Sequence, residues 1–299
     1  MLNKIILVTM AGLLLCCVAV PAAYAQGKCS LRTFAGTYAF YEKGSSLLLD
    51  PSQQLLPLHW AGSVATYVNV GEVTFSPQGV GNGFYWILLG ALNGGLDPIP
   101  VQVTITEMKE DCSGKFTYTA NLPGGLSATI EERFILFDNG REYRSVPTSI
   151  VNGVSTLAWI GTGHRISKSA RKPWFCGPQT AHGTYMLTAE NIIDLDPKTA
   201  VADSLLIRED VSLTGDYTGT LYEKLGPIFP IELPVSGTTI VNSDCSFTTN
   251  LNVEGIPGPI VIKGVFFNEG KEYYGLAIFD QGNASPFMYS FAQGIRIGQ

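Results

Sequence analysis

Charged residues are scarce in this chain of 299 residues, where they make up 15% of the sequence. There are 19 Lys and Arg against 25 Asp and Glu, which gives a formal net charge of −6. A chain so poor in cations lacks the electrostatic footprint of proteins that bind nucleic acids or anionic membranes. Its one basic cluster, Arg165 to Lys172, is interpreted as a solvated linker, with a docking patch as the alternative.

Recognisable catalytic motifs are also missing. The sequence has no Gly-x-Ser-x-Gly elbow, no phosphate-binding glycine loop and no His-Glu-x-x-His pair. It holds three histidines, His59, His164 and His182, and no cysteine or histidine pair with the spacing of a structural zinc site. We therefore expect no metal and no cofactor, assign no catalytic residue, and lean against an enzyme.

A long apolar run occurs at the N-terminus. One cation, Lys4, precedes the apolar residues Ile5 to Val20, and Ala23-Tyr24-Ala25 has the small-x-small pattern of a cleavage site. The run falls short of the roughly 20 residues that a membrane-spanning helix needs. Residues 1–25 are thus predicted to be a signal peptide cleaved after Ala25, which implies export to the periplasm or beyond and no membrane insertion of the mature chain.

Four cysteines remain after this cleavage: Cys29, Cys112, Cys176 and Cys245. An exported protein meets an oxidising compartment, so disulfides are expected, and four cysteines allow three pairings. An internal repeat selects one of them, because each copy opens with a Cys and carries a second one within Asp-Cys-Ser. The predicted pairs are Cys29 with Cys112 and Cys176 with Cys245.

The internal repeat divides the chain into two units. Cys29–Tyr38 and Cys176–Tyr185 share Cys, Thr, Gly, Thr and Tyr at identical offsets. Further matches follow in the same order: Val73–Ser76 with Val211–Thr214, the Asp-Cys-Ser tripeptides, the hairpins Phe137–Tyr143 and Phe267–Tyr273, and the endings Gly163–Ile166 and Gly294–Ile297. We expect a first domain at 26–166, a linker at 167–173 and a second domain at 174–299.

Short strands dominate each unit. Segments such as Val101–Thr106 alternate apolar and polar residues with period two, and turn signals such as Asn139-Gly140 separate them. In the first copy, Phe34, Tyr38 and Phe40 are placed on one face of the first strand. Roughly eight short strands are predicted in the first copy: Phe34–Tyr41, Glu72–Ser76, Phe84–Leu89, Val101–Thr106, Lys115–Thr119, Thr129–Phe137, Glu142–Val146 and Ser155–Ile160.

The predicted fold class is all-β, with two tandem antiparallel β-barrels of about eight strands each. Phe84–Leu89 and Arg133–Phe137 carry apolar side chains on both faces, which suits an inner wall and a covered outer wall. Two β-sandwiches are the alternative. A leucine-rich connection, Gly44–Trp60, is expected to close one barrel end, either as a plug or as a lid over a ligand cavity.

A resemblance adds to this interpretation of the fold. The patterns Thr-x-x-Gly-Thr-Tyr, Val-Thr-Phe-Ser, Asp-Cys-Ser-Gly and Asp-Asn-Gly-Arg-Glu-Tyr resemble a group of uncharacterised exported bacterial proteins. Their domain is similar to the small lipocalin-like barrel of the allene oxide cyclase type, a class that binds hydrophobic small molecules. The second copy departs from the pattern, with Phe247 where the first has Gly114. The resemblance implies fold rather than activity, and no functional residue is carried over.

Three functions stay open. The first is non-enzymatic binding of a small hydrophobic ligand or a partner, since apolar interiors with few polar groups are typical of ligand sites. The second is a shape-directed cyclase or isomerase, and the third is a structural or interaction module of the envelope. His59, Tyr38 and Glu132 are the first candidates for groups that face a ligand. The sequence does not determine the oligomeric state.

Overall fold

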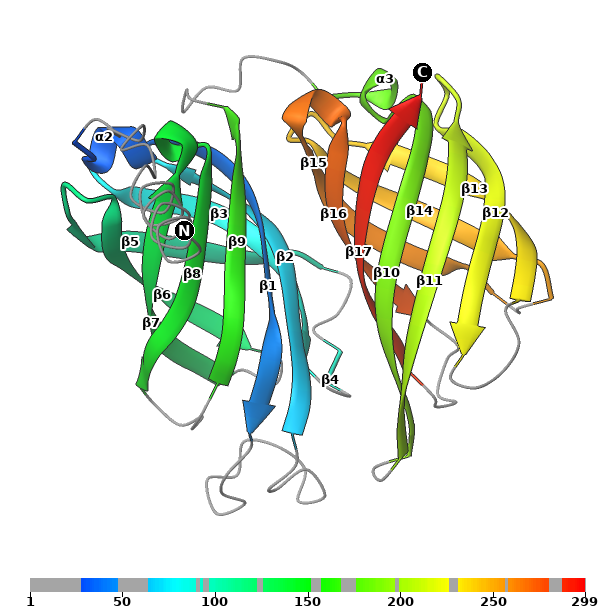
Figure 1. The fold of residues 1–299 in the computed structure, drawn as a ribbon, viewed down its shortest axis with the longest axis horizontal. Coiled ribbons are helices and arrows are strands. Elements are labelled where there is room, and N and C mark those ends of the chain that lie inside the picture. Colours follow the sequence, from blue (N-terminus) through cyan, green and yellow to red (C-terminus); the bar gives the residue numbers. More distant parts are fainter. Residues whose placement is uncertain are drawn as a thin grey trace, which may run out of the picture.

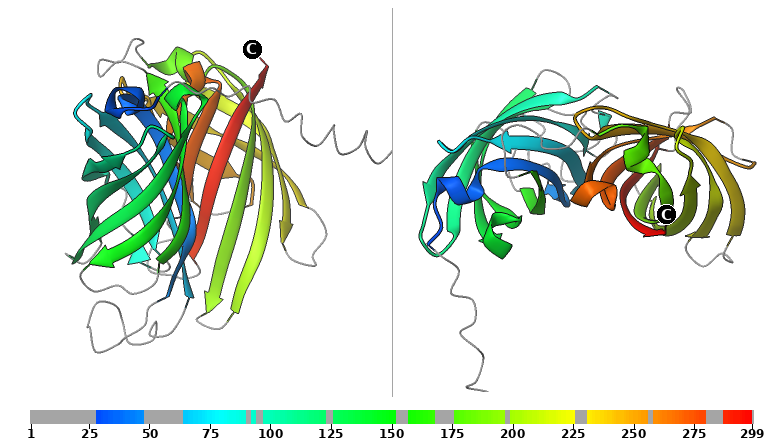
Figure 2. Two further views of the ribbon diagram at one scale, coloured as in Figure 1. Left: turned by 60° about the vertical axis from the view of Figure 1, so that its left-hand side comes forward. Right: turned by 90° about the horizontal axis from the view of Figure 1, so that it is seen from above.

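The computed structural model describes residues 28–47, 64–89, 92–93, 97–122, 126–151, 157–167, 176–196, 199–225, 231–255, 258–279 and 287–298. These residues form two closed antiparallel barrels of eight strands each, which stand side by side (Figures 1 and 2). The predicted tandem barrels are confirmed, and the sandwich alternative is wrong. The predicted signal peptide, His59 and most of the leucine-rich connection and of the linker lie outside the described residues.

The first barrel closes through hydrogen bonds between β2 and β3, after the order β2-β1-β9-β8-β7-β6-β5-β3. Each of the eight strands expected in the first copy overlaps one of its strands, and a two-residue strand, β4 (Leu92–Asn93), pairs with the end of β3. The strands are β1 (Gly36–Leu47), β2 (Val64–Phe75), β3 (Val80–Leu89), β5 (Ile99–Met108), β6 (Ser113–Leu122), β7 (Leu126–Phe137), β8 (Glu142–Val151) and β9 (Leu157–Ser167).

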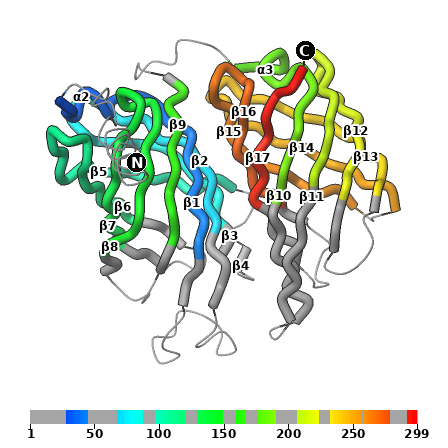
Figure 3. Tube along the Cα trace, viewed as in Figure 1, coloured from blue at the N-terminus to red at the C-terminus, as the bar shows by residue number. Residues whose placement is uncertain are grey.

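The second barrel has the simplest closed order, β10 through β17, with β10 paired to β17. Figure 3 follows the chain from the blue and green strands of the first barrel to the green, yellow and red strands of the second. The strands of the second barrel are β10 (Gly183–Asp196), β11 (Thr199–Val211), β12 (Asp216–Leu225), β13 (Ile231–Val241), β14 (Ser246–Val253), β15 (Ile260–Phe267), β16 (Glu272–Phe279) and β17 (Phe287–Gly298).

Each barrel has a hydrogen-bond network at the end where the chain enters it. One-turn helices, α2 (Leu31–Phe34) and α3 (Pro178–Ala181), lie at this end (Figure 1). The Tyr38 hydroxyl donates to the Gly140 carbonyl at 2.7 Å, and the Arg165 Nη2 donates to that hydroxyl at 2.8 Å. The expectation that Phe34 begins the first strand is wrong, because Phe34 ends α2 and packs its ring into the barrel mouth.

The same network recurs in the second barrel. Tyr185 donates to Gly270 at 2.7 Å, and the Arg296 Nη2 donates to the Tyr185 hydroxyl at 2.8 Å. The hairpins at Gly140 and Gly270 have positive φ values of 76° and 74°, as the Asn-Gly signal in the first copy predicts. The endings of the two copies therefore match as expected from the sequence.

One element of the sequence alignment needs correction. Ser76 and Ser212 make equivalent turn hydrogen bonds, to Val80 and Asp216 respectively. The structure therefore matches Val211 with Phe75, two residues away from the alignment that sets Val211 against Val73. The local pattern was misleading because a strand with period two looks alike after a shift of two residues.

Both predicted disulfides are present, Cys29–Cys112 and Cys176–Cys245. The first disulfide joins the segment before α2 to the turn that precedes β6, and the second joins the segment before α3 to the turn that precedes β14. The second cysteine has a positive φ in both copies, 70° at Cys112 and 71° at Cys245. The repeat thus preserves backbone geometry as well as pairing.

The exchange of Gly114 for Phe247 has a packing explanation. Gly114 lies opposite Phe134 in the first barrel, and a Cβ atom at Gly114 would come within 2.5 Å of the Phe134 ring. In the second barrel the ring is on the other strand, since Phe247 lies opposite Gly264. A Cβ at Gly264 would come within 2.7 Å of the Phe247 ring. One aromatic ring thus fills the same layer from opposite strands, which maintains core volume.

An apolar joint connects the outer walls of the two barrels. Val70 and Trp86 of the first barrel belong to one buried cluster with Phe267 and Leu276 of the second. Trp86 comes from the segment expected to carry apolar residues on both faces, and the other copy covers its outer face. The remaining buried members are Ala39, Val68, Val265 and Tyr274.

Candidate functional site

The hydroxyl of Tyr38, one of the three candidates from the sequence, is engaged in hydrogen bonds within the first barrel. This hydroxyl accepts from Arg165 and donates to Gly140, as Tyr185 does in the other copy. Burial raises the pKa of Tyr38 to about 12, although the charge of Arg165 opposes the shift. The Tyr38 hydroxyl is therefore held in place by Arg165 and the Gly140 carbonyl. His59 lies outside the described residues.

Glu132, the remaining candidate, points into the first barrel and is completely buried. Its Oε1 accepts from the Tyr118 hydroxyl and from the Trp159 Nε1, both at 2.9 Å. A second buried carboxylate, Glu42, lies on the other side of Tyr118, with oxygen distances of 3.3 and 3.4 Å to the same hydroxyl. Asn69 donates to Glu42 at 2.7 Å. These five residues are called the polar cluster.

Burial governs the protonation of the polar cluster. Loss of solvation raises the pKa of Glu132, and the hydrogen bonds from Tyr118 and Trp159 offset only part of the shift. Burial, together with the charges of Glu42 and Glu132, raises the pKa of the neighbouring Tyr143 well above its usual value. Burial therefore shifts both Glu132 and Tyr143 toward their protonated forms.

The second barrel lacks the polar cluster. Counting from the shared tyrosine, cysteine and hairpin contacts, Ala189 stands in place of Glu42, Leu251 in place of Tyr118 and Ile262 in place of Glu132. All three are buried in the apolar core of the second barrel. The interiors of the two copies thus differ in polarity at these three positions.

Among the side chains that the structure describes in the second barrel, Glu209 is a buried carboxylate at a position that differs from that of the polar cluster. Glu209 is 6% exposed, and its Oε1 accepts from the Tyr273 hydroxyl at 2.9 Å. Burial raises the pKa of Glu209 to about 7. The corrected alignment places Val73 at the equivalent position of the first barrel, so this site is also not shared.

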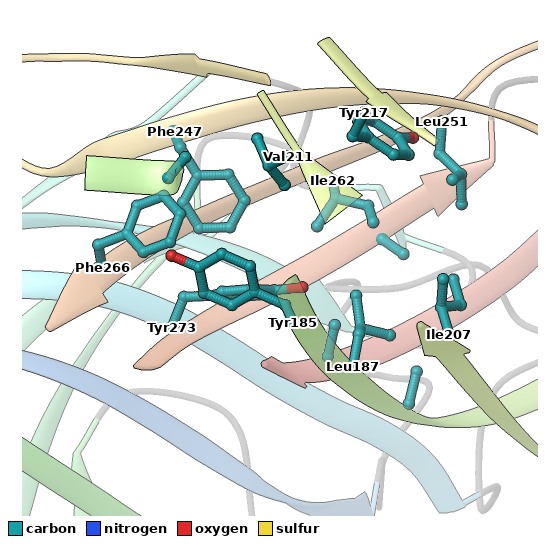
Figure 4. Packing of buried hydrophobic residues seen from close by; sticks show 14 of the residues in the cluster. Tyr185, Leu187, Ile207, Val211, Tyr217, Phe247, Leu251, Ile262, Phe266 and Tyr273 are labelled. Atoms are coloured by element: carbon teal, nitrogen blue, oxygen red, sulfur yellow. The ribbon is translucent and has the colours of Figure 1, made fainter. Parts of the chain in front are cut away.

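Both barrel interiors are filled where the structure describes them. The first has a cavity of about 20 Å³ beside Glu42, Asn69 and Tyr118, and the second has one of about 10 Å³ beside Glu209 and Tyr273. Figure 4 shows the apolar side chains of the second core turned toward one another. A water molecule needs roughly 10–15 Å³ and a drug-sized ligand about 300–1,000 Å³. Among the described residues, these cavities have room for water alone.

A much larger hollow lies on the outer wall of the first barrel. This outer groove has a volume of about 460 Å³ and runs across β5 to β9. Its apolar lining includes Ile135, Val146 and Ile160, which are 51%, 47% and 58% exposed. Its charged lining is mostly cationic, with Lys109, Lys115, Arg133 and Arg144 against Glu107.

The outer groove corrects one expectation from the sequence. Arg133–Phe137 was expected to have a covered outer face, but Ile135 and Phe137 are 51% and 40% exposed. The alternation of the strand identified these outward side chains correctly. The alternation does not indicate whether another element covers these side chains.

Sequence reasoning also missed Glu42 in the polar cluster. Glu42 lies on β1, and its bridging partner Tyr118 is 76 residues away in the chain. The predicted first strand ended at Tyr41, whereas β1 runs from Gly36 to Leu47 and includes Glu42. Continued by one residue, the alternation would have placed Glu42 on the face of Tyr38 and Phe40.

The remaining histidines contact neighbouring elements. The His164 ring stacks on Phe267 in the joint between the barrels, with centroids 5.1 Å apart. The His182 Nδ1 lies 3.0 Å from the Val211 carbonyl. In the part of the chain that the structure describes, no three His, Cys, Asp or Glu gather as metal ligands, and no helix is long and apolar enough to cross a membrane.

Comparisons with known proteins give no assignment. No protein-family model matches the chain, and no curated protein does. A protein of unknown function of the DUF3598 family from Nostoc punctiforme is 10% identical over 90% of this chain and 100% of its own, with a TM-score of 0.28. The intact Ap-TbpB, with its N and C lobes, is 9% identical over 88% of this chain and 77% of its own, with a TM-score of 0.27. Overlap this weak does not bear on function.

Proposed function

We propose that this chain is an exported, non-enzymatic binding protein that holds its partner on the outer wall of its first barrel. The observation that carries the proposal is a difference in volume. The outer groove measures about 460 Å³, whereas the interior cavities lined by described residues measure about 20 and 10 Å³. A groove of this size falls within the range of known ligand sites.

Export is supported by the two disulfides, which persist in oxidising compartments and are rare in the cytosol. The apolar N-terminal segment with its Ala-Tyr-Ala end agrees with this proposal. The resemblance to exported lipocalin-like or allene oxide cyclase-like barrels belongs to the same proposal, and it concerns the fold alone.

The alternatives that place function inside the barrel receive less support. A hydrophobic ligand or a cyclase substrate would have to reach Glu132, and the described cavity near the polar cluster holds about 20 Å³. Glu132 has the inward position and raised pKa of an acid catalyst, but no comparable space lies beside it among the described side chains. We therefore propose no reaction.

Lysine labelling tests the position of the binding surface. Protein isolated gently from its own cells is acetylated alongside a sample that was unfolded, dialysed and refolded, and mass spectrometry reads each site. Lys109 lines the outer groove, and Lys271 of the second barrel serves as a matched control, since both side chains are 59% exposed. We expect slower labelling of Lys109 in the gently isolated sample and equal labelling of Lys271. Equal labelling at Lys109, with no added mass in native mass spectrometry, would refute the proposal.

A further inference from the structure

We infer that the outer groove of the first barrel binds a small amphipathic anion, a molecule with one carboxylate-like head and an aliphatic chain. This inference rests on the proposed function and specifies the ligand of the same site. The strand register, the ion pairs and the size of the groove support it.

The register places charge and apolar surface in one row. Lys115 on β6 lies opposite Arg133 on β7, and Arg133 lies opposite Val146 on β8. Ser145 pairs with Gly161, so the next step of the antiparallel ladder brings Val146 beside Ile160 on β9. The row therefore runs from two cations to two aliphatic side chains.

Arg133 is the cation in this row that is available to a ligand. Lys115 is already 3.3 Å from Glu131, and Lys109 pairs with Glu107 at 3.1 Å. For Arg133, which is exposed, the described residues provide no carboxylate within ion-pair distance. Its guanidinium can therefore donate two parallel hydrogen bonds to a carboxylate.

The pairing of Lys115 with Arg133 strengthens the argument for an anion. Like charges directly opposite each other on neighbouring strands destabilise a sheet. Glu131 offsets part of this repulsion, because it pairs with Lys115 and also lies within the field of Arg133. A bound anion between Lys115 and Arg133 would remove the remainder, so the protein gains stability on binding.

The apolar half of the groove can hold a chain. Two strand spacings separate Arg133 from Ile160, a distance of about 10 Å. Ile135 lies on the same outer face, and its partner across the strands is Arg144. Arg144 donates to Glu142 at 2.7 Å and to Thr162 at 2.8 Å, so its head group is engaged and its stem adds to the apolar floor.

The size of the groove favours a small molecule over a protein. A stable protein interface buries roughly 800 Å² on each partner. The exposed apolar lining here consists of only three aliphatic side chains among the described residues, Ile135, Val146 and Ile160. A volume of about 460 Å³ matches a small ligand instead.

Titration calorimetry with laurate below its micelle concentration tests the ligand class. We expect one laurate per chain, and no comparable binding of dodecyltrimethylammonium, which has the same chain length and the opposite charge. Arg133→Gln should weaken laurate binding at least about tenfold, because it removes a charge-assisted hydrogen-bond pair. Ile160→Ser should also weaken it, through loss of apolar contact.

Two matched variants on the second barrel provide controls. Arg208 on β11 is exposed, and Ile240 on β13 is 61% exposed. Arg208→Gln and Ile240→Ser should leave laurate binding unchanged, and circular dichroism should show that all four variants are folded.

Three results would overturn the inference. These are no laurate binding, equal binding of the cationic detergent, or binding that survives both Arg133→Gln and Ile160→Ser. The proposed function fails separately, through equal labelling of Lys109 in the two samples with no added mass in native mass spectrometry. If laurate does not bind but Lys109 is acetylated more slowly in protein isolated from its own cells, the proposed binding site is supported and the proposed ligand class is wrong.

Discussion

Replacing Glu209 by Gln should remove a pH dependence from the stability of the second barrel. Glu209 is buried, and its pKa rises from 4.5 to about 7 in the folded state. Between these two values the folded protein keeps a proton that the unfolded chain releases. The free energy of unfolding therefore falls as the pH rises through this interval. Below pH 4.5 the carboxyl is protonated in both states, and above pH 7 it is ionised in both.

The size of the effect follows from the shift. A change of one pKa unit corresponds to about 1.36 kcal/mol, so the shift from 4.5 to about 7 amounts to about 3 kcal/mol. Gln cannot ionise, and its carbonyl can still accept from the Tyr273 hydroxyl. The advantage of the Glu209→Gln variant over the wild type should therefore be about 3 kcal/mol larger at about pH 8 than at about pH 4.

Hydrogen exchange read by mass spectrometry measures this effect in the second barrel by itself. Peptides from β11 and β16 report the free energy of opening around Glu209, and peptides from β7 serve as an internal reference. Glu232→Gln, an exposed change on β13, is the matched control. If the difference between the Glu209→Gln variant and the wild type is the same at the acidic and the alkaline pH, the proposed burial of this carboxyl is wrong.

Three further predictions concern the scaffold. Trp86→Ala should lower the free energy of unfolding by about 3 kcal/mol in denaturant titrations, because it empties the joint between the barrels; no loss would show that the joint adds little. Gly140→Ala should cost about 1–3 kcal/mol, since φ is +76° and the new Cβ would clash with the Thr33 carbonyl of α2. Gly255→Ala, with φ +82° and no atom within 4 Å, should cost less, and equal losses would exclude the steric cause. Changing Cys29 and Cys112 to Ser should cost about 4–5 kcal/mol in the chain-entropy model, and an unchanged thermal midpoint would contradict that model.

Much of the fold could be predicted from local patterns. Strand-like segments between turn signals, several of them with period-two alternation, located all eight strands of the first barrel, and the Asn-Gly signal located a hairpin with positive φ. These predictions succeeded because strand alternation and turn geometry depend on neighbouring residues. Phe34 was an exception, since the close packing of its ring with Phe75 and Phe134 in the barrel mouth is a tertiary contact.

The candidate site could be predicted only in part. Glu132 was identified as a first candidate, and the structure places it inside the first barrel. Glu42 was not, because Tyr118 reaches both carboxylates only when β1, β6 and β7 are curved into one closed wall. The outer groove was not expected either, since its lining comes from β5 through β9.

The sequence by itself determined the duplication, the pairing of the four cysteines and the all-β class. Each of these follows from repeated residues or from spacing along the chain. The tertiary structure decided which outward faces are covered: Trp86 packs against the second barrel, whereas Ile135 and Ile160 stay exposed beside Arg133. Alternation assigns side chains to two faces, but burial of an outer face depends on how whole barrels pack, and no local pattern encodes that.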